Sequence, residues 1–90
     1  IDEALIDALP KESSCADLVE LYPNLIVTRS FSKFYGLAGM RIGYMVADKE
    51  VIRHVSKTVS PFEVSSLSIE LAKAVLLDEE FQRKARKRNE

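Results

Sequence analysis

Two short runs of strand-forming residues, at positions 25–28 and 41–47, constrain the fold most, because the link between them is short for a crossover helix. Both runs are apolar and contain β-branched or aromatic side chains, which predicts two strands. A parallel pair of strands needs a connection of about a dozen residues or more, usually a helix. The link at positions 30–39 is instead a loop of small and polar residues. The second strand is therefore predicted to run antiparallel to the first, or not to be its neighbour.

The residues before the first of these strands predict a parallel partner for it. Ile1 is interpreted as the last residue of a strand, and positions 10–14 form a turn-rich stretch. A short helix with one apolar side is predicted at 16–21, and Pro23 follows it as a stop. Strand, helix and strand over this length make a right-handed crossover between parallel strands. The predicted fold class is α/β, with a mostly parallel sheet and helices.

Three later helices are predicted from candidate capping residues. Asp48 is the candidate cap of the first, which is expected to end at positions 60–61. Ser65 or Ser66 is the candidate cap of the second, and Asp78 of the last, which is rich in lysine and arginine. The apolar residues expected to share a face are Val51, Ile52, Val55 and Val59 in the first helix and Leu67, Leu71, Ala74 and Val75 in the second.

The composition argues against several classes of function. With 30% charged residues and a formal net charge of -1, the chain has no excess of positive charge for binding nucleic acid. No apolar run approaches the ~20 residues of a membrane span. Cys15 is the only cysteine and His54 the only histidine, so neither an internal disulfide nor a metal site is predicted. The lone thiol fits a reducing cytoplasm.

Hydroxyls, an amine and a guanidinium gather around the loop that follows the first strand. Ser30, Ser32 and Lys33 lie at the carboxyl end of a predicted parallel strand, and Asp2 lies at the end of the preceding one. In open α/β sheets, ligands bind just beyond the carboxyl ends of the parallel strands. These side chains, with Arg41 at the far end of the loop, are therefore expected to converge on one rim of the sheet.

Each of these residue types has a chemical reason to lie at such a rim. A lysine held near apolar and cationic neighbours has a lowered pKa, which frees its amine to attack a carbonyl. Hydroxyls and the planar guanidinium of Arg41 are suited to hold a phosphate. Gly36 and Gly39 let the backbone turn tightly and approach a ligand closely, and a carboxylate can keep a ring nitrogen protonated. Together these groups describe a site for a phosphorylated aldehyde that bears a basic ring.

The run from Ser30-Phe31-Ser32-Lys33 through Gly36-Leu37-Ala38-Gly39-Met40-Arg41-Ile42-Gly43-Tyr44 resembles the cofactor-lysine motif of the class I/II pyridoxal-phosphate-dependent aminotransferases. Within that class it is most similar to the histidinol-phosphate aminotransferase group. Positions 2–4 resemble the family's upstream acidic motif, and positions 61–65 match its later layout. The resemblance implies a fragment of the large domain of a fold type I transferase. Residues 1–60 would belong to the cofactor-binding large domain, and residues 61–90 would be helices leading toward a small domain.

The resemblance also implies a role for each motif residue. Lys33 would be the catalytic residue and would bind pyridoxal 5'-phosphate covalently through its amine. Asp2 would pair with the ring nitrogen, Ser30 and Arg41 would bind the phosphate, and Ser32 would lie near it. Without the motif around them, Lys33 and Arg41 would each be interpreted as an ordinary surface residue. One position departs from the family pattern, since the tyrosine expected three residues after the aspartate is Leu5 here.

The reaction implied is a transamination of histidinol phosphate with 2-oxoglutarate, part of amino-acid biosynthesis in the cytoplasm, by an enzyme that is a homodimer. Its small-molecule partners would be an amino donor and a 2-oxo acid. A threonine-phosphate decarboxylase-like enzyme carries a very similar motif and stays open as an alternative. Ile1 in place of a starting Met and the predicted helix at the other end suggest cuts through a longer protein. The isolated chain is therefore also considered as a non-catalytic structural fragment.

Overall fold

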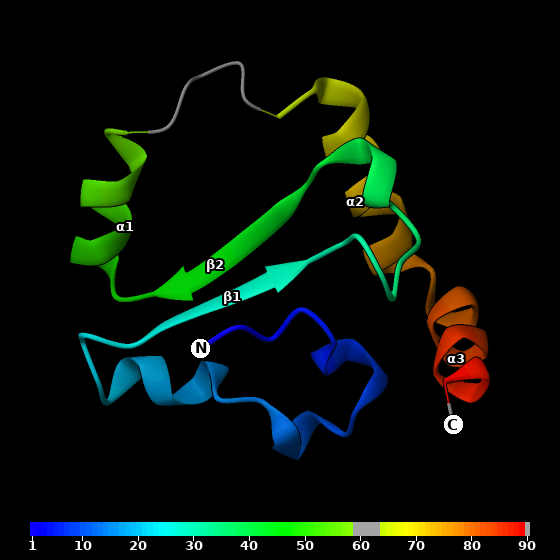
Figure 1. Cartoon of the computed structure of the whole chain (residues 1–90), viewed down its shortest axis with the longest axis horizontal. Coiled ribbons are helices and arrows are strands. Elements are labelled where there is room, and N and C mark those ends of the chain that lie inside the picture. Colours follow the sequence, from blue (N-terminus) through cyan, green and yellow to red (C-terminus); the bar gives the residue numbers. More distant parts are fainter. Residues whose placement is uncertain (59–63, 90) are drawn as a thin grey trace.

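The computed structural model describes residues 1–58 and 64–89 as a flattened body of 37 × 32 × 18 Å (Figure 1). Within these residues a two-stranded sheet is accompanied by three α-helices and several short 3-10 turns. The strands are β1 (Ile26–Ser30) and β2 (Gly43–Ala47), and the helices are α1 (Lys49–Ser56), α2 (Ser66–Leu77) and α3 (Glu79–Arg88). The 3-10 turns are η1 (Ile6–Ala8), η2 (Lys11–Ser13), η3 (Ala16–Glu20) and η4 (Ala38–Met40).

Strand β1 lies between the N-terminal segment and β2 (Figure 1). It pairs antiparallel with β2, from Ile26 opposite Ala47 to Ser30 opposite Gly43, which confirms the first of the two predicted arrangements. On its other side, Thr28 forms a parallel bridge with Asp2. The predicted parallel pairing is thus limited, in the part of the chain that the structure describes, to one bridge. Two backbone hydrogen bonds flank this bridge, from the N–H of Thr28 to the oxygen of Ile1 over 2.9 Å and from the N–H of Glu3 to the oxygen of Thr28 over 2.8 Å.

The strand boundaries differ from the predicted ones at both ends of this loop. Strand β1 continues to Ser30, which the sequence places in the loop. Strand β2 begins at Gly43 instead of position 41, because Arg41 has φ 50° and ψ 58°. These angles lie in the left-handed region, outside the range of an extended strand, and non-glycine residues rarely adopt them.

Gly43 is required by the close approach of the two strands, so we expect Gly43→Ala to destabilise the fold. A Cβ at this position would lie 2.7 Å from the backbone oxygen of Arg29, which cannot move away without disturbing β1. Overpacking of this kind costs about 1–3 kcal/mol. Urea unfolding should show the loss, and Gly39→Ala is the matched control because nothing lies within 4 Å of its added Cβ. Equal unfolding midpoints for the two variants would contradict the argument.

The predicted capping residues are confirmed. The side chain of Asp48 accepts a hydrogen bond from the N–H of Glu50, 3.0 Å away, at the start of α1. Ser65 is the cap of α2 and Asp78 the cap of α3. The predicted end of the first helix, at positions 60–61, and its Val59 lie outside the described residues. The helix predicted at 16–21 is the 3-10 turn η3, which ends at Glu20.

The buried face of helix α2 matches the predicted one only in part, since Val75 packs against the core as expected. Its buried residues are Ser68 and Ala72, whereas Leu67 is 62% exposed. Small side chains at these two positions, one helical turn apart, let α2 approach the neighbouring loop closely. Ser68 also donates its hydroxyl to the backbone oxygen of Met40 over 2.7 Å, so a polar group is satisfied on the buried face.

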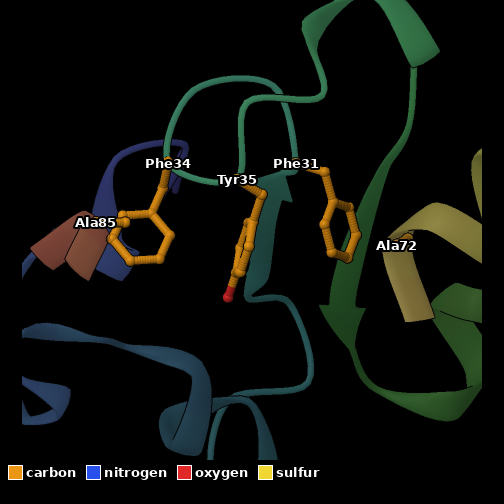
Figure 2. Packing of buried hydrophobic residues seen from close by; sticks show 5 residues of the cluster. All are labelled: Phe31, Phe34, Tyr35, Ala72 and Ala85. Atoms are coloured by element: carbon orange, nitrogen blue, oxygen red, sulfur yellow. The ribbon is translucent and has the colours of Figure 1, made fainter. Parts of the chain in front are cut away.

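The core is a row of three aromatic rings from the loop after β1 (Figure 2). Phe31, Phe34 and Tyr35 are buried, with ring centroids 5.2 Å apart for Phe31 and Tyr35 and 4.9 Å apart for Phe34 and Tyr35. The row extends from Ala85 of α3 to Ala72 of α2 (Figure 2). The loop that carries the predicted motif is therefore anchored by its aromatic side chains between the last two helices.

In the described residues, no helix has the length and apolar character needed to cross a membrane. The same residues contain no cluster of three or more histidine, cysteine, aspartate or glutamate side chains that could hold a metal ion.

Candidate active site

Lys33 is an exposed residue in a loop that is otherwise tied down. Phe31 and Phe34, on either side of it, are buried in the core. The backbone N–H of Gly36 donates to the oxygen of Lys33 over 3.2 Å, and that of Leu37 donates to the oxygen of Phe31 over 3.0 Å. Gly36 has φ 71°, a conformation that glycine adopts without strain. The amine of Lys33 is thus presented to solvent from a backbone held on both sides.

Ser30 and Ser32 form a small turn at the end of β1. The hydroxyl oxygen of Ser30 accepts a hydrogen bond from the N–H of Ser32, 2.9 Å away. Both residues are half-buried. Because a hydroxyl has one hydrogen and two lone pairs, Ser30 can still donate that hydrogen to a ligand.

Arg41 is exposed at the far end of the loop. One of its guanidinium nitrogens, Nη1, donates to the backbone oxygen of Ala38 over 2.9 Å, which leaves other N–H groups of the fork facing solvent. The N–H of Phe31 donates to the oxygen of Ile42 over 3.2 Å. This bond joins the residue after Ser30 to the residue after Arg41, so the two ends of the loop are held together.

Asp2 lies on the same face of β1 as Ser30. Its bridge partner is Thr28, and side chains along a strand alternate between faces, so Thr28 and Ser30 share one face. The Asp2 carboxylate is exposed, with Oδ1 accepting from the N–H of Ala4 over 2.9 Å. The structure therefore brings the Asp2 segment and the two ends of the loop to one edge of the sheet. Leu5, where the family pattern has a tyrosine, is 59% exposed.

The phenol nearest to Lys33 in the sequence is engaged in the core. The hydroxyl of Tyr35 donates to Oδ1 of Asp7 over 3.2 Å. Burial, and then the neighbouring Asp7 carboxylate, raise the pKa of Tyr35 to about 12. Tyr35 therefore remains a neutral hydrogen-bond donor at neutral pH, and its role is to fix the loop rather than to accept protons.

An ion pair that the sequence analysis missed lies on the opposite face of β1. Glu3 is buried, and its carboxylate accepts from the Arg29 guanidinium, the Ser14 hydroxyl and the N–H of Cys15. Burial alone would raise the pKa of Glu3, but these three donors outweigh it and lower the pKa below its ordinary value of 4.5. The predicted strand ended at position 28, so Arg29 gave no sign of being a strand charge that needs a partner.

The same face carries a hollow of about 380 Å³. Its charged lining residues are Asp7, Lys11, Asp17, Arg29 and Arg86. None of the predicted cofactor residues lines it, and Arg29 points to the face opposite Ser30. The hollow is therefore separate from the edge that Asp2 and Ser30 share, and we place the candidate site at that edge because Asp2, Ser30 and the ends of the Lys33 loop meet there.

Comparison with known proteins gives the same family as the motif. The family described as Aminotransferase class I and II matches residues 1–90. Histidinol-phosphate aminotransferase 1 of Mannheimia succiniciproducens is 44% identical over 91 aligned residues, covering 99% of this chain and 25% of the relative. The histidinol-phosphate aminotransferase of Listeria innocua is also 44% identical, over 90% of this chain and 23% of its own length.

A solved structure shares the fold. The crystal structure of histidinol-phosphate aminotransferase from Sinorhizobium meliloti, in complex with pyridoxal-5'-phosphate, matches with a TM-score of 0.86 and 31% identity. The match covers 94% of this chain and 23% of that one, and it confirms the predicted fold class. The chain spans about a quarter of the length of the curated relatives described above. Motif, fold and family match agree that this chain belongs to the class I and II aminotransferase family.

Proposed function

We propose that this chain is the cofactor-lysine segment of a pyridoxal-phosphate-dependent aminotransferase that transfers the amino group of histidinol phosphate. The observation that carries the proposal is the exposed amine of Lys33 on an anchored loop, within a chain that matches the aminotransferase family throughout. The relatives named above are histidinol-phosphate aminotransferases, and the solved one is in complex with pyridoxal-5'-phosphate.

The groups at the sheet edge fit this cofactor by their chemistry. The phosphate needs donors, and Ser30 and Arg41 each retain hydrogens beyond the bonds described above. Ser32 adds a second hydroxyl beside Ser30. A protonated ring nitrogen needs a carboxylate, and Asp2 is exposed with Oδ2 available. The aldehyde needs an amine, which Lys33 provides.

The role of each residue follows from these groups. Lys33 would hold the cofactor through Nζ, and the same nitrogen, when free, would move a proton from the substrate α-carbon. Asp2 holds the proton of the ring nitrogen, and Ser30, Ser32 and Arg41 fix the phosphate. Bound pyridoxal phosphate supplies the electron sink for the carbanion. The protein contributes position and charge.

We further propose 2-oxoglutarate as the amino acceptor, a homodimeric complete enzyme, and a cytoplasmic location that the lone cysteine fits. Residues 1–60 belong, in this proposal, to the cofactor-binding large domain, and residues 61–90 lead toward a small domain. The sequence similarity to histidinol-phosphate aminotransferases supports the choice of substrate.

We expect the complete enzyme, of which this chain is the proposed segment, to form glutamate from histidinol phosphate and 2-oxoglutarate. The reaction should depend on added pyridoxal phosphate after the cofactor has been removed. The test is a glutamate assay beside a carbon dioxide assay with threonine phosphate. Carbon dioxide release without glutamate formation would replace the proposal by a decarboxylase. The absence of both products would overturn it.

A further inference from the structure

The buried ion pair between Glu3 and Arg29 is held by further hydrogen bonds to neighbouring groups. The two side chains are 4% and 19% exposed, and Nη2 of Arg29 lies 3.1 Å from Oε1 of Glu3. Oε1 also accepts from the Ser14 hydroxyl at 2.9 Å, and Oε2 accepts from the N–H of Cys15 at 2.6 Å. Nη2 of Arg29 donates to the same Ser14 hydroxyl over 2.6 Å. Each carboxylate oxygen therefore has a fixed partner.

The pair joins segments that carry the proposed site. Glu3 directly follows Asp2 and donates its backbone N–H to the oxygen of Thr28 over 2.8 Å. Arg29 directly precedes Ser30 and also donates to the hydroxyl of Tyr44, its partner in β2, over 3.3 Å. One side chain of β1 thus reaches the N-terminal segment on one side and β2 on the other.

A buried ion pair contributes little net stability, because removing two charges from water costs about as much as their attraction returns. What it does supply is a defined geometry, since a shift of either partner leaves a buried charge unsatisfied. Here that geometry includes the peptide unit between Asp2 and Glu3. The Asp2 carboxylate lies on the other face of the same short segment, so fixing Glu3 also fixes where Asp2 can place its oxygens.

We propose that Glu3 is a positioning residue that acts through Asp2: its pairing with Arg29 holds the Asp2 carboxylate at the sheet edge, in register with Ser30. This inference rests on the proposed function, in which Asp2 holds the proton of the cofactor ring nitrogen. Glu3 does not touch the cofactor in this arrangement, because its side chain is on the opposite face of β1.

The test is Glu3→Gln in the complete enzyme, a change that keeps the size of the side chain and removes its charge. We expect kcat to fall about 10- to 100-fold, as for small displacements of catalytic groups, with the KM for the amino donor within about twofold of wild type. The absorbance spectrum of the bound cofactor should change in the same direction as in Asp2→Asn. Arg29→Gln should lower kcat by a similar factor. The double variant should lower kcat by no more than either single variant, because both residues act through one contact.

Val19→Ala is the matched control, since Val19 is buried, apolar and outside the ion-pair network. It should lower the thermal midpoint while the cofactor spectrum and kcat stay at wild-type values. If Glu3→Gln resembled Val19→Ala in spectrum and kcat, the pair would be merely structural and the inference would be overturned. An inactive wild-type enzyme, or a fully active Lys33→Ala variant, would instead overturn the proposed function and this inference with it.

Discussion

Replacing Lys33 with alanine is expected to abolish amino transfer in the complete enzyme while part of the cofactor affinity remains. The variant would lose Nζ of Lys33, the one nitrogen that is proposed both to bind the cofactor and to move the α-proton. Proton transfer by a positioned side chain alone contributes about 100- to 10,000-fold. In the proposed site, Ser30 and Arg41 would still hold the phosphate of this variant, so equilibrium dialysis should detect weakened, non-covalent binding.

Borohydride reduction of the wild-type enzyme identifies the same residue independently. It should fix the cofactor on Lys33, and peptide mapping should find the label on no other lysine. The controls are Lys49, the first residue of α1, and Lys57, its C-cap, which are both exposed, and their alanine variants should keep full activity and full labelling. Label on either of them would show that the assignment of Lys33 is wrong.

Replacing Asp2 with alanine is expected to slow α-proton removal about 10- to 1,000-fold. A carboxylate within ~4–6 Å of a cation shifts a pKa by about 1–3 units, and each unit is a factor of ten in the protonated population. The loss should appear in kcat, because Asp2 is not expected to contact the amino donor. Its measurement is the exchange of the substrate α-hydrogen with deuterated solvent.

Asp17→Ala is the control for this experiment, because Asp17 is an exposed aspartate of η3. Its exchange rate should equal that of the wild type. Near-normal exchange in Asp2→Ala would mean that another residue holds the ring nitrogen. A large rise in KM with unchanged kcat would mean that Asp2 binds substrate instead.

Features that depend on a few neighbouring residues were predictable from the sequence. Asp48, Ser65 and Asp78 each bond to a backbone N–H two or three residues away, so a local pattern contains the whole interaction. The motif residues are likewise close together in the sequence, and their roles stay predictions. Ser30, Lys33 and Arg41 lie within one loop whose two ends are joined by strand pairing.

Features that depend on distant residues were not predictable from the same patterns. The partners Glu3 and Arg29 are 26 residues apart, and each alone resembles a solvent-exposed charge. The buried face of α2 was predicted only in part: Val75 packs against the core as expected, but Leu67 is exposed and the fully buried positions are the small residues Ser68 and Ala72. The left-handed conformation of Arg41 is set by the turn it occupies and leaves no signal in an arginine.

The row of aromatic rings beside Lys33 has a consequence for the order in which the chain acquires its structure during synthesis. Phe34 packs in a cluster with Ala85, and the guanidinium of Arg86 lies 5.6 Å from the Phe34 ring and donates to the backbone of Asp7, 79 residues earlier. A ribosome adds about 5–20 residues per second, so roughly 3–10 s separate the synthesis of Phe34 from that of Ala85. Until then, one side of the ring row has no partner, and its apolar surface is open to chaperones. The loop that presents Lys33 therefore reaches its final form only after α3 has been made.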